Sequence, residues 1–124
     1  MSSWLWVAAG SALGGAGRYA VALLLVPWTG PRLVWATFVV NLLGSFLIGY
    51  ITALTGDSGR STVSPDLRLF LTAGVLGGFT TFSAFSLQTI ELLQSGHALR
   101  ALIYVTASVV LCLLGAWLGL TAGR

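Results

Sequence analysis

Four long apolar segments are the feature that most limits how this chain can fold. They lie at about residues 4–26, 33–55, 67–93 and 98–120, separated by short polar turns. A helix needs about 20 apolar residues to cross a hydrocarbon core of about 30 Å, and each segment reaches that length. The sequence therefore predicts a single membrane domain, residues 1–124, that is all-α and crosses the membrane four times.

The composition indicates that lipid surrounds much of the chain. Hydrophobic residues make up 56% of it and charged residues 7%, and the mean hydropathy is +0.94. A soluble chain of this length would have too few polar residues to cover its surface. We therefore expect a multi-pass membrane protein, with the lipid bilayer as its partner.

Nucleic-acid binding and enzymatic activity lack their usual sequence signals. The net charge of +3 comes from six Arg scattered singly along the chain. Nucleic-acid binding needs clustered cations that displace counterions from a phosphate backbone. No nucleophile elbow, phosphate loop, metal-ligand cluster or pair of intramembrane carboxylates stands in the sequence. We expect no nucleic-acid partner, no catalytic residue and no enzyme.

The arginines near the ends of the segments favour neither orientation in the membrane. The side that holds both termini and the opposite side carry nearly equal numbers: three (Arg60, Arg68, Arg124) against two or three (Arg32, Arg100 and, if it snorkels that way, Arg18). Such a chain could insert both ways up. Two copies in opposite orientations would then supply twice as many helices, where those of one copy are too few to enclose a pore.

Polar side chains follow one face of the second segment and one face of the fourth. In the second segment Thr37, Asn41 and Ser45 recur every four residues, as Tyr104 and Ser108 do in the fourth. Residues at this spacing lie on the same helix face. A single stripe of this kind within lipid can simply form hydrogen bonds between helices. Two stripes together favour a path for water or ions.

The third segment contains a sequence that weakens a helix near its middle. The paired glycines Gly77 and Gly78 are followed by the β-branched Thr80 and Thr81, whose hydroxyls offer the backbone other hydrogen bonds. We therefore expect the third helix to break there, and broken membrane helices commonly form ion sites. Freed carbonyls near Gly77 and Thr80 could bind a hard cation, whereas freed amides and hydroxyls could donate to an anion.

Two phenylalanines follow the expected break. Phe82 and Phe85 lie three residues apart, beside Ser83. Because the edge of a phenyl ring carries partial positive charge, such rings can face an anion without a full cation that would trap it. A Phe stripe in a membrane helix more often faces lipid, but the adjacent Gly-Gly and Thr-Thr pairs favour the anion path. In the first segment Arg18 is a further functional candidate, with snorkelling to the interface as the alternative.

Three motifs together resemble the Fluc (CrcB-type) family of bacterial fluoride channels. They are Gly14-Gly15-Ala16-Gly17-Arg18-Tyr19, Asn41-Leu42-Leu43-Gly44-Ser45-Phe46 and Gly77-Gly78-Phe79-Thr80-Thr81-Phe82-Ser83-Ala84-Phe85. The resemblance spans all four helices in the same order, and the third motif is the most specific.

The resemblance implies a fluoride-selective channel that exports fluoride passively through two pores of an antiparallel, dual-topology homodimer. It implies a structural sodium ion (Na+) at the dimer centre, held by backbone carbonyls of Gly77 and Thr80 from both subunits. It also implies that Arg18 and Gln88 lie at an aqueous vestibule and that Asn41 donates to fluoride. The implied pore wall is Asn41, Phe82, Phe85, Ser83, Thr81, Tyr104, Ser108 and Thr37.

Two positions depart from the pattern of that family. Ala84 stands where a Thr is common, so one hydroxyl along the path is missing, and Gln88 stands where a Glu is common. Neither change removes a core motif, but both bear on the conduction rate and on the electrostatics of the vestibule.

Two other functions compete with the fluoride channel. A small four-helix multidrug antiporter needs a titratable carboxylate deep in the membrane, but the first two segments contain none and Glu91 is near an end of the third. The chain could also be a non-conducting partner subunit of a heterodimeric channel. Its retention of Asn41, Phe82 and Phe85 favours a conducting homodimer.

Overall fold

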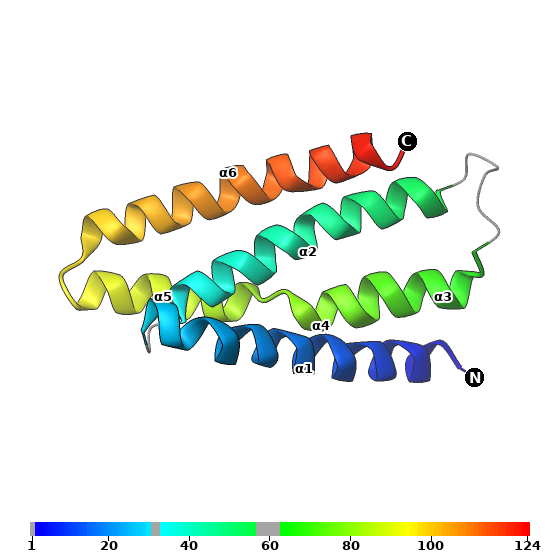
Figure 1. Cartoon of the computed structure of the whole chain (residues 1–124), viewed down its shortest axis with the longest axis horizontal. Coiled ribbons are helices and arrows are strands. Elements are labelled where there is room, and N and C mark those ends of the chain that lie inside the picture. The colour runs from blue at the N-terminus through cyan, green and yellow to red at the C-terminus, as the bar shows by residue number, and fades with distance from the viewer. Residues whose placement is uncertain (1, 31–32, 57–62) are drawn as a thin grey trace.

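The fold of the chain is entirely helical in the residues that its computed structural model describes, which are 2–30, 33–56 and 63–124 (Figure 1). Helices α1 (Ser3–Thr29), α2 (Val34–Thr55) and α6 (Ala98–Ala122) and the third span, Pro65–Gln94, are long and apolar enough to cross a membrane. The predicted all-α architecture with four membrane-spanning helices is confirmed. Arg32 and Arg60 of the orientation argument lie outside the described residues.

The first helix extends beyond its predicted end. The sequence predicted an end at Val26 because Pro27 follows, but α1 continues through Pro27 to Thr29. The hydroxyl of Thr29 donates to the Leu25 carbonyl at 2.9 Å, and the Gly30 amide donates to the Val26 carbonyl at 2.9 Å. Gly30, with a φ of 79°, then ends the helix in a conformation that L side chains rarely adopt. The proline therefore precedes the end of the helix by one short turn.

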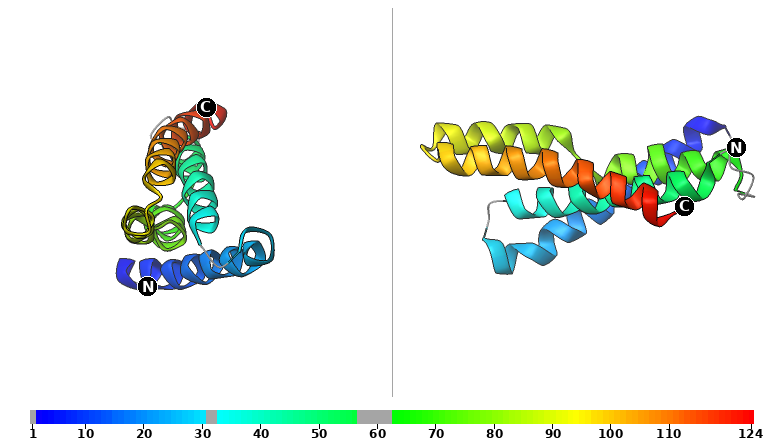
Figure 2. Two further views of the ribbon diagram at one scale, coloured as in Figure 1. Left: turned by 90° about the vertical axis from the view of Figure 1, so that its left-hand side faces the viewer. Right: turned by 90° about the horizontal axis from the view of Figure 1, so that it is seen from above.

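The spans form two pairs that run side by side. Helix α2 packs along α6, and α1 packs along the first half of the third span (Figures 1 and 2). Both termini lie at the same end of the bundle, as an up-and-down order of helices requires (Figure 1).

Glycines allow the helices of each pair to approach until their backbones touch. A Cβ atom on Gly10 would lie 2.8 Å from the Gly74 Cα, and one on Gly49 would lie 2.9 Å from the Leu120 amide nitrogen. These are distances at which one helix would have to shift. Gly14, Gly78 and Gly119 lie at contacts of the same kind, where small residues let membrane helices pack closely.

The third span is a chain of four short elements rather than one regular helix. It consists of α3 (Pro65–Leu69), the π-helical turn η1 (Phe70–Leu76), α4 (Gly77–Phe79) and α5 (Phe82–Gln94). Thr80 and Thr81 join α4 to α5 in extended conformations, with ψ angles of 160° and 116°. The break therefore lies at the end of the predicted Gly-Gly-Phe-Thr-Thr sequence. The π-helical turn was not predicted.

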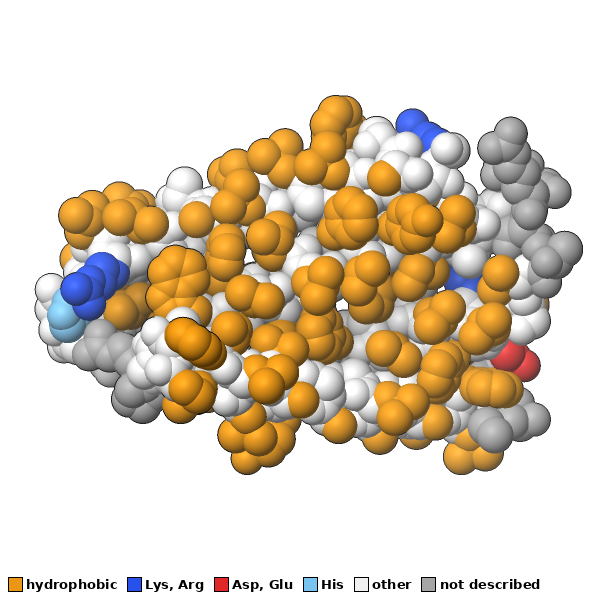
Figure 3. Space-filling model, in the orientation of Figure 1, with side chains coloured by type: hydrophobic (Ala, Val, Ile, Leu, Met, Phe, Trp, Pro, Cys, Tyr) orange, Lys and Arg blue, Asp and Glu red, His pale blue; other side chains and the backbone are white. Residues whose placement is uncertain are grey.

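The surface is dominated by apolar side chains between two charged ends. In Figure 3 hydrophobic side chains cover the middle of the visible face, while the positive, negative and histidine side chains lie toward the ends of the bundle. Exposed large residues include Trp4, Trp28, Trp35, Phe82 and Trp117. Such a surface suits lipid or a partner chain, and the aromatic residues near the ends suit the membrane–water interfaces.

Candidate functional site

The break in the third span is closed by the hydroxyls of its own two threonines. The Thr80 hydroxyl donates to the Leu76 carbonyl at 3.0 Å, so it holds the end of the preceding helical turn. The Thr81 hydroxyl accepts a hydrogen bond from the Ala84 amide at 3.2 Å and caps the N-terminus of α5. Local hydroxyl bonds thus replace regular helix bonds, as the Thr-Thr sequence predicted.

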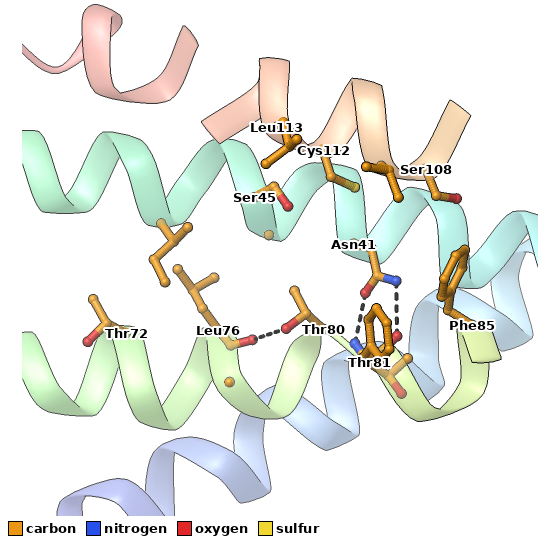
Figure 4. A pocket seen from close by; sticks show the side chains of 15 residues that line it. Asn41, Ser45, Thr72, Leu76, Thr80, Thr81, Phe85, Ser108, Cys112 and Leu113 are labelled. Atoms are coloured by element: carbon orange, nitrogen blue, oxygen red, sulfur yellow. Dashed lines mark hydrogen bonds between the residues drawn. The ribbon is translucent and has the colours of Figure 1, made fainter. Parts of the chain in front are cut away.

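Asn41, on α2, binds the backbone of the break through its side chain. Its side-chain oxygen accepts from the Thr81 amide at 2.8 Å, and its side-chain nitrogen donates to the Thr81 carbonyl at 3.0 Å (Figure 4). Both main-chain groups of an extended residue at membrane depth are therefore satisfied by one carboxamide. One of the two Nδ2 hydrogens is used in this way, and the second is the donor that remains for another ligand.

Arg18, on α1, points inward to the other side of the break. Its Nε donates to the Gly78 carbonyl at 3.2 Å, at the C-terminal end of α4. A cation is favourable at this end of a helix, where carbonyls lack helical partners. The half-buried side chain thus approaches the break instead of extending to the interface.

The same hydrogen bonds leave two carbonyls without the donors that a continuous helix would give them. In an α-helix the Gly77 carbonyl would receive the Thr81 amide, but that amide donates to Asn41. The Thr80 carbonyl would likewise receive the Ala84 amide, which donates to the Thr81 hydroxyl. Gly77 and Thr80 are the residues predicted to hold a cation, so the geometry fits a hard cation with oxygen ligands. Within the described residues no group of three His, Cys, Asp or Glu could hold a metal ion.

The two phenylalanines differ in exposure: one ring is exposed and the other is buried. Phe82 is 77% exposed and Phe85 only 8%, although their ring centroids are 5.4 Å apart. Phe85 also packs against the buried ring of Tyr104, with centroids 5.1 Å apart. The protomer by itself therefore presents Phe82 outward, next to an inward Phe85.

A groove of about 410 Å³ brings most of the predicted residues together between α2, the third span and α6 (Figure 4). It is lined by both rings, part of each polar stripe and both residues predicted to hold a cation: Asn41, Thr81, Phe82, Phe85, Ser108, Gly77 and Thr80. The Ser108 hydroxyl is buried and has no hydrogen-bond partner among the described residues. A buried hydroxyl without a partner can donate to a ligand or to a second chain.

A second cavity, of about 290 Å³, joins the predicted vestibule residues to the break. Arg18 and Gln88 line it together with Thr37 and Thr81. Thr81 lines both cavities, so the vestibule side and the groove side meet at the break.

Two predicted pore residues lie outside this arrangement. Ser83 is exposed, with its hydroxyl 3.3 Å from that of Thr81. Tyr104 is buried, and its hydroxyl donates to the Gln88 side-chain oxygen at 2.8 Å. Tyr104 therefore reaches the vestibule side through Gln88.

Sequence reasoning missed two residues that shape the groove. Thr72 lines the groove and follows the same four-residue spacing as Leu76 and Thr80, which was a signal that could have identified it. Gly44 faces the Thr80 side chain so closely that a Cβ there would meet the Thr80 methyl group. Its place between Asn41 and Ser45 in the polar stripe was the corresponding signal.

Comparison with known proteins gives a consistent result. The family model for CrcB-like protein, Camphor Resistance (CrcB), matches residues 5–120. The chain is 50% identical over 119 residues to a protein of Opitutus terrae, covering 96% of this chain and 90% of that one. It is 49% identical over 116 residues to a protein of Methylocella silvestris, covering 94% and 88%, and 45% identical over 124 residues to one of Rhizobium meliloti, covering 100% and 98%. Each of these relatives is named fluoride-specific ion channel FluC.

Proposed function

Because this chain belongs to the CrcB-like family, we propose that it is a fluoride-specific ion channel that conducts through two pores of an antiparallel homodimer. The fluoride channel is the function of the family's named relatives, and the four membrane-spanning helices make the chain a multi-pass protein of the plasma membrane. A channel catalyses no reaction, so fluoride leaves the cell passively, down its electrochemical gradient.

The observation that carries the conducting role is the groove at the break. Fluoride is small and strongly hydrated, so a pore must replace its water with many neutral donors. The groove and the adjoining vestibule offer the second amide hydrogen of Asn41, the Ser108 hydroxyl and the edges of Phe82 and Phe85. The N-terminus of α5, the positive end of its dipole, also begins at this place.

The half-open groove supports the proposed homodimer. Phe82 is 77% exposed at its edge, and one wall of the groove is missing in a single protomer. A second copy in the opposite orientation would cover Phe82 and close the path. It would also bring a second Gly77 and a second Thr80 to the centre.

A sodium ion at the dimer centre fits the freed carbonyls of Gly77 and Thr80. Four such oxygens from two chains would form a shell for a hard cation that neither chain completes alone. When bound, the ion would supply positive charge that stabilises the two breaks against each other. Replacing sodium with N-methylglucamine should lower the thermal stability of the purified dimer, whereas an unchanged midpoint would contradict the site.

The test of the function is ion efflux from liposomes that contain the purified protein. We expect fluoride efflux far above the background of empty liposomes and little chloride efflux. Equal rates for the two anions would contradict the fluoride channel. Proton-coupled transport of a cationic drug, with no fluoride efflux, would instead support the multidrug antiporter. That function needs a carboxylate within the membrane, and residues 1–56 contain none.

The test of the dual topology is labelling of a cysteine at Ser2 in intact cells, in a Cys112→Ser background. Ser2 is exposed at the end of the bundle that holds both termini. We expect about half of the copies to be labelled from each side. Labelling from one side alone would exclude the antiparallel homodimer and would favour a partner chain of the opposite orientation.

A further inference from the structure

A groove of about 550 Å³ lies between α2 and α6, away from the break. Its walls are mainly apolar and include Val34, Trp35, Phe38, Ile103 and Ala107. Its charged lining residue among those described is Arg100, in the first turn of α6. We propose that this groove, here called the Arg100 groove, binds an anionic phospholipid, with one acyl chain along its apolar walls and the phosphate on Arg100.

The Arg100 groove faces away from the ion groove. Along α6, successive residues turn by about 100°. Val109 and Leu113 line the ion groove, whereas Ile103 and Ala107 line the Arg100 groove about 120° around the helix from them. A second copy that closes the ion groove would therefore leave the Arg100 groove open to the bilayer. The occupant that the bilayer supplies there is a lipid.

The dimensions of the groove match part of one leaflet. From Arg100 to Ala107 the helix rises by about 10 Å, at about 1.5 Å per residue. One leaflet contributes about half of a hydrocarbon core of about 30 Å. The exposed ring of Trp35 lies at the same end as Arg100, in the position of an aromatic belt residue. Arg100 and Trp35 thereby mark the level of the headgroup and the start of the acyl chain.

The charge of Arg100 is not neutralised by a neighbouring side chain within the described residues. Its exposed side chain has no hydrogen-bond or ion-pair partner there. The first turn of α6 contains no acidic residue, and a cation at the N-terminus of a helix is opposed by the helix dipole. In Figure 3 a positive side chain and the histidine lie together at the end of the bundle opposite the termini. A lipid phosphate would supply the missing negative charge.

The floor of the groove connects it to the channel. Val34 and Phe38 pack against the buried cluster of Phe85, Leu92, Ala101 and Tyr104. A lipid chain in the groove would cover the outer side of this cluster, so it would stabilise the packing behind Phe85. Tyr104, a predicted pore-wall residue, also lines this groove. Lipid retention is nevertheless measured without reference to the ion that the channel conducts.

The experiment is native mass spectrometry of the full-length dimer in detergent, with added phosphatidylglycerol or phosphatidylcholine of the same acyl chains. We expect wild-type protein to retain about fivefold more phosphatidylglycerol, the preference that one interfacial arginine gives. Arg100→Gln should abolish the preference. Arg124→Gln removes an exposed arginine from the opposite end of α6, outside the groove, and should leave the preference unchanged.

A further variant tests the apolar part of the site. Ala107→Leu fills the groove and should lower the retention of both lipids, while dimer elution on a sizing column reports folding. Equal retention of the two lipids by wild-type protein, or equal effects of Arg100→Gln and Arg124→Gln, would overturn the proposal.

Discussion

The break in the third span and the α2–α6 pair join helices in different ways. At the break, polar side chains from α1 and α2 bind backbone groups: Arg18 donates to Gly78, and Asn41 both donates to and accepts from Thr81. Between α2 and α6, glycines let the backbones touch, as Gly49 does against Ala116. The polar contacts hold an irregular backbone in place, and the glycine contacts let two regular helices pack closely.

The two regions also differ in what a substitution should do. A change at the break alters groups that we propose face the ion, so conduction should respond before folding does. A change at a glycine contact moves a whole helix, so stability should respond first. The four predictions below test this difference, from the largest expected effect to the smallest.

Phe82→Ile and Phe85→Ile should reduce fluoride flux the most. Isoleucine keeps the apolar bulk but removes the positively polarised ring edge, and we expect a loss of roughly a hundredfold, as when one preorganised electrostatic partner is removed. Efflux from liposomes measures it, and dimer elution on a sizing column is the folding control. Because Phe85 is buried and Phe82 is exposed, Phe85→Ile should also cost up to about 1.5 kcal/mol of stability.

Wild-type flux in both well-folded variants would place the pore on another face of the third span. A lipid-facing Phe82 ring would give that result for the exposed position, since the hydrophobic effect hardly distinguishes Phe from Ile in a bilayer.

Asn41→Asp should lower both flux and stability. The new carboxylate keeps the acceptor for the Thr81 amide but places a negative oxygen against the Thr81 carbonyl, where Asn41 now donates. Loss of that bond in a dry site should cost about 1–3 kcal/mol, and the negative charge should repel fluoride. Chemical denaturation and liposome efflux measure the two effects.

Ser45→Asp is the matched control for that variant. It adds the same charge one turn along α2, in the same groove, but leaves the two bonds to Thr81 intact. Flux should fall in both variants. The loss of stability that comes from releasing the break should appear only in Asn41→Asp. Equal loss of stability in both would mean that the carboxamide does not hold the break.

These polar contacts mark the limit of what the sequence could predict. The length and hydropathy of the segments predicted four spans, because a membrane crossing depends on those local properties alone. The Gly-Gly and Thr-Thr pairs predicted the break, because both weaken a helix locally. The partners of the break were different: Arg18 and Gly78 are 60 residues apart, and Asn41 and Thr81 are 40 apart. A polar residue type shows that a partner is needed without showing which one the fold provides.

The π-helical turn η1 is a second feature that the sequence did not predict. Its sequence, Phe70–Leu76, is an ordinary apolar run with one glycine. What distinguishes it is its packing along α1, where the backbone at Gly74 touches that at Gly10. The spacing of the glycines indicates a close helix contact, but nothing in it indicates the π-helical turn that accompanies this contact.

Gly49→Ala should destabilise the scaffold without changing the preference for fluoride. The added Cβ would meet the backbone carbonyl of Ala116, so α6 must move or strain, at a cost of about 1–3 kcal/mol. Gly15→Ala is the control: it lies within α1 with open space around it, so it should gain up to about 1 kcal/mol from helix propensity. A change in the fluoride-to-chloride ratio in Gly49→Ala would show that the scaffold and the break are not separate in function.

Tyr104→Phe should give the smallest effect, and it decides how Tyr104 acts. The resemblance to fluoride channels places Tyr104 at the pore wall, but in the protomer its hydroxyl donates to the Gln88 side chain. Removing a hydrogen bond of this kind should cost about 0.5–1.5 kcal/mol. If the hydroxyl acts by holding Gln88, Tyr104→Phe should lower flux in wild-type protein but have no further effect in a Gln88→Leu background. If the hydroxyl binds fluoride itself, the loss should be the same in both backgrounds. The double-mutant cycle therefore separates a residue that positions the vestibule from one that lines the path, because the coupling between the two changes is present only in the first case.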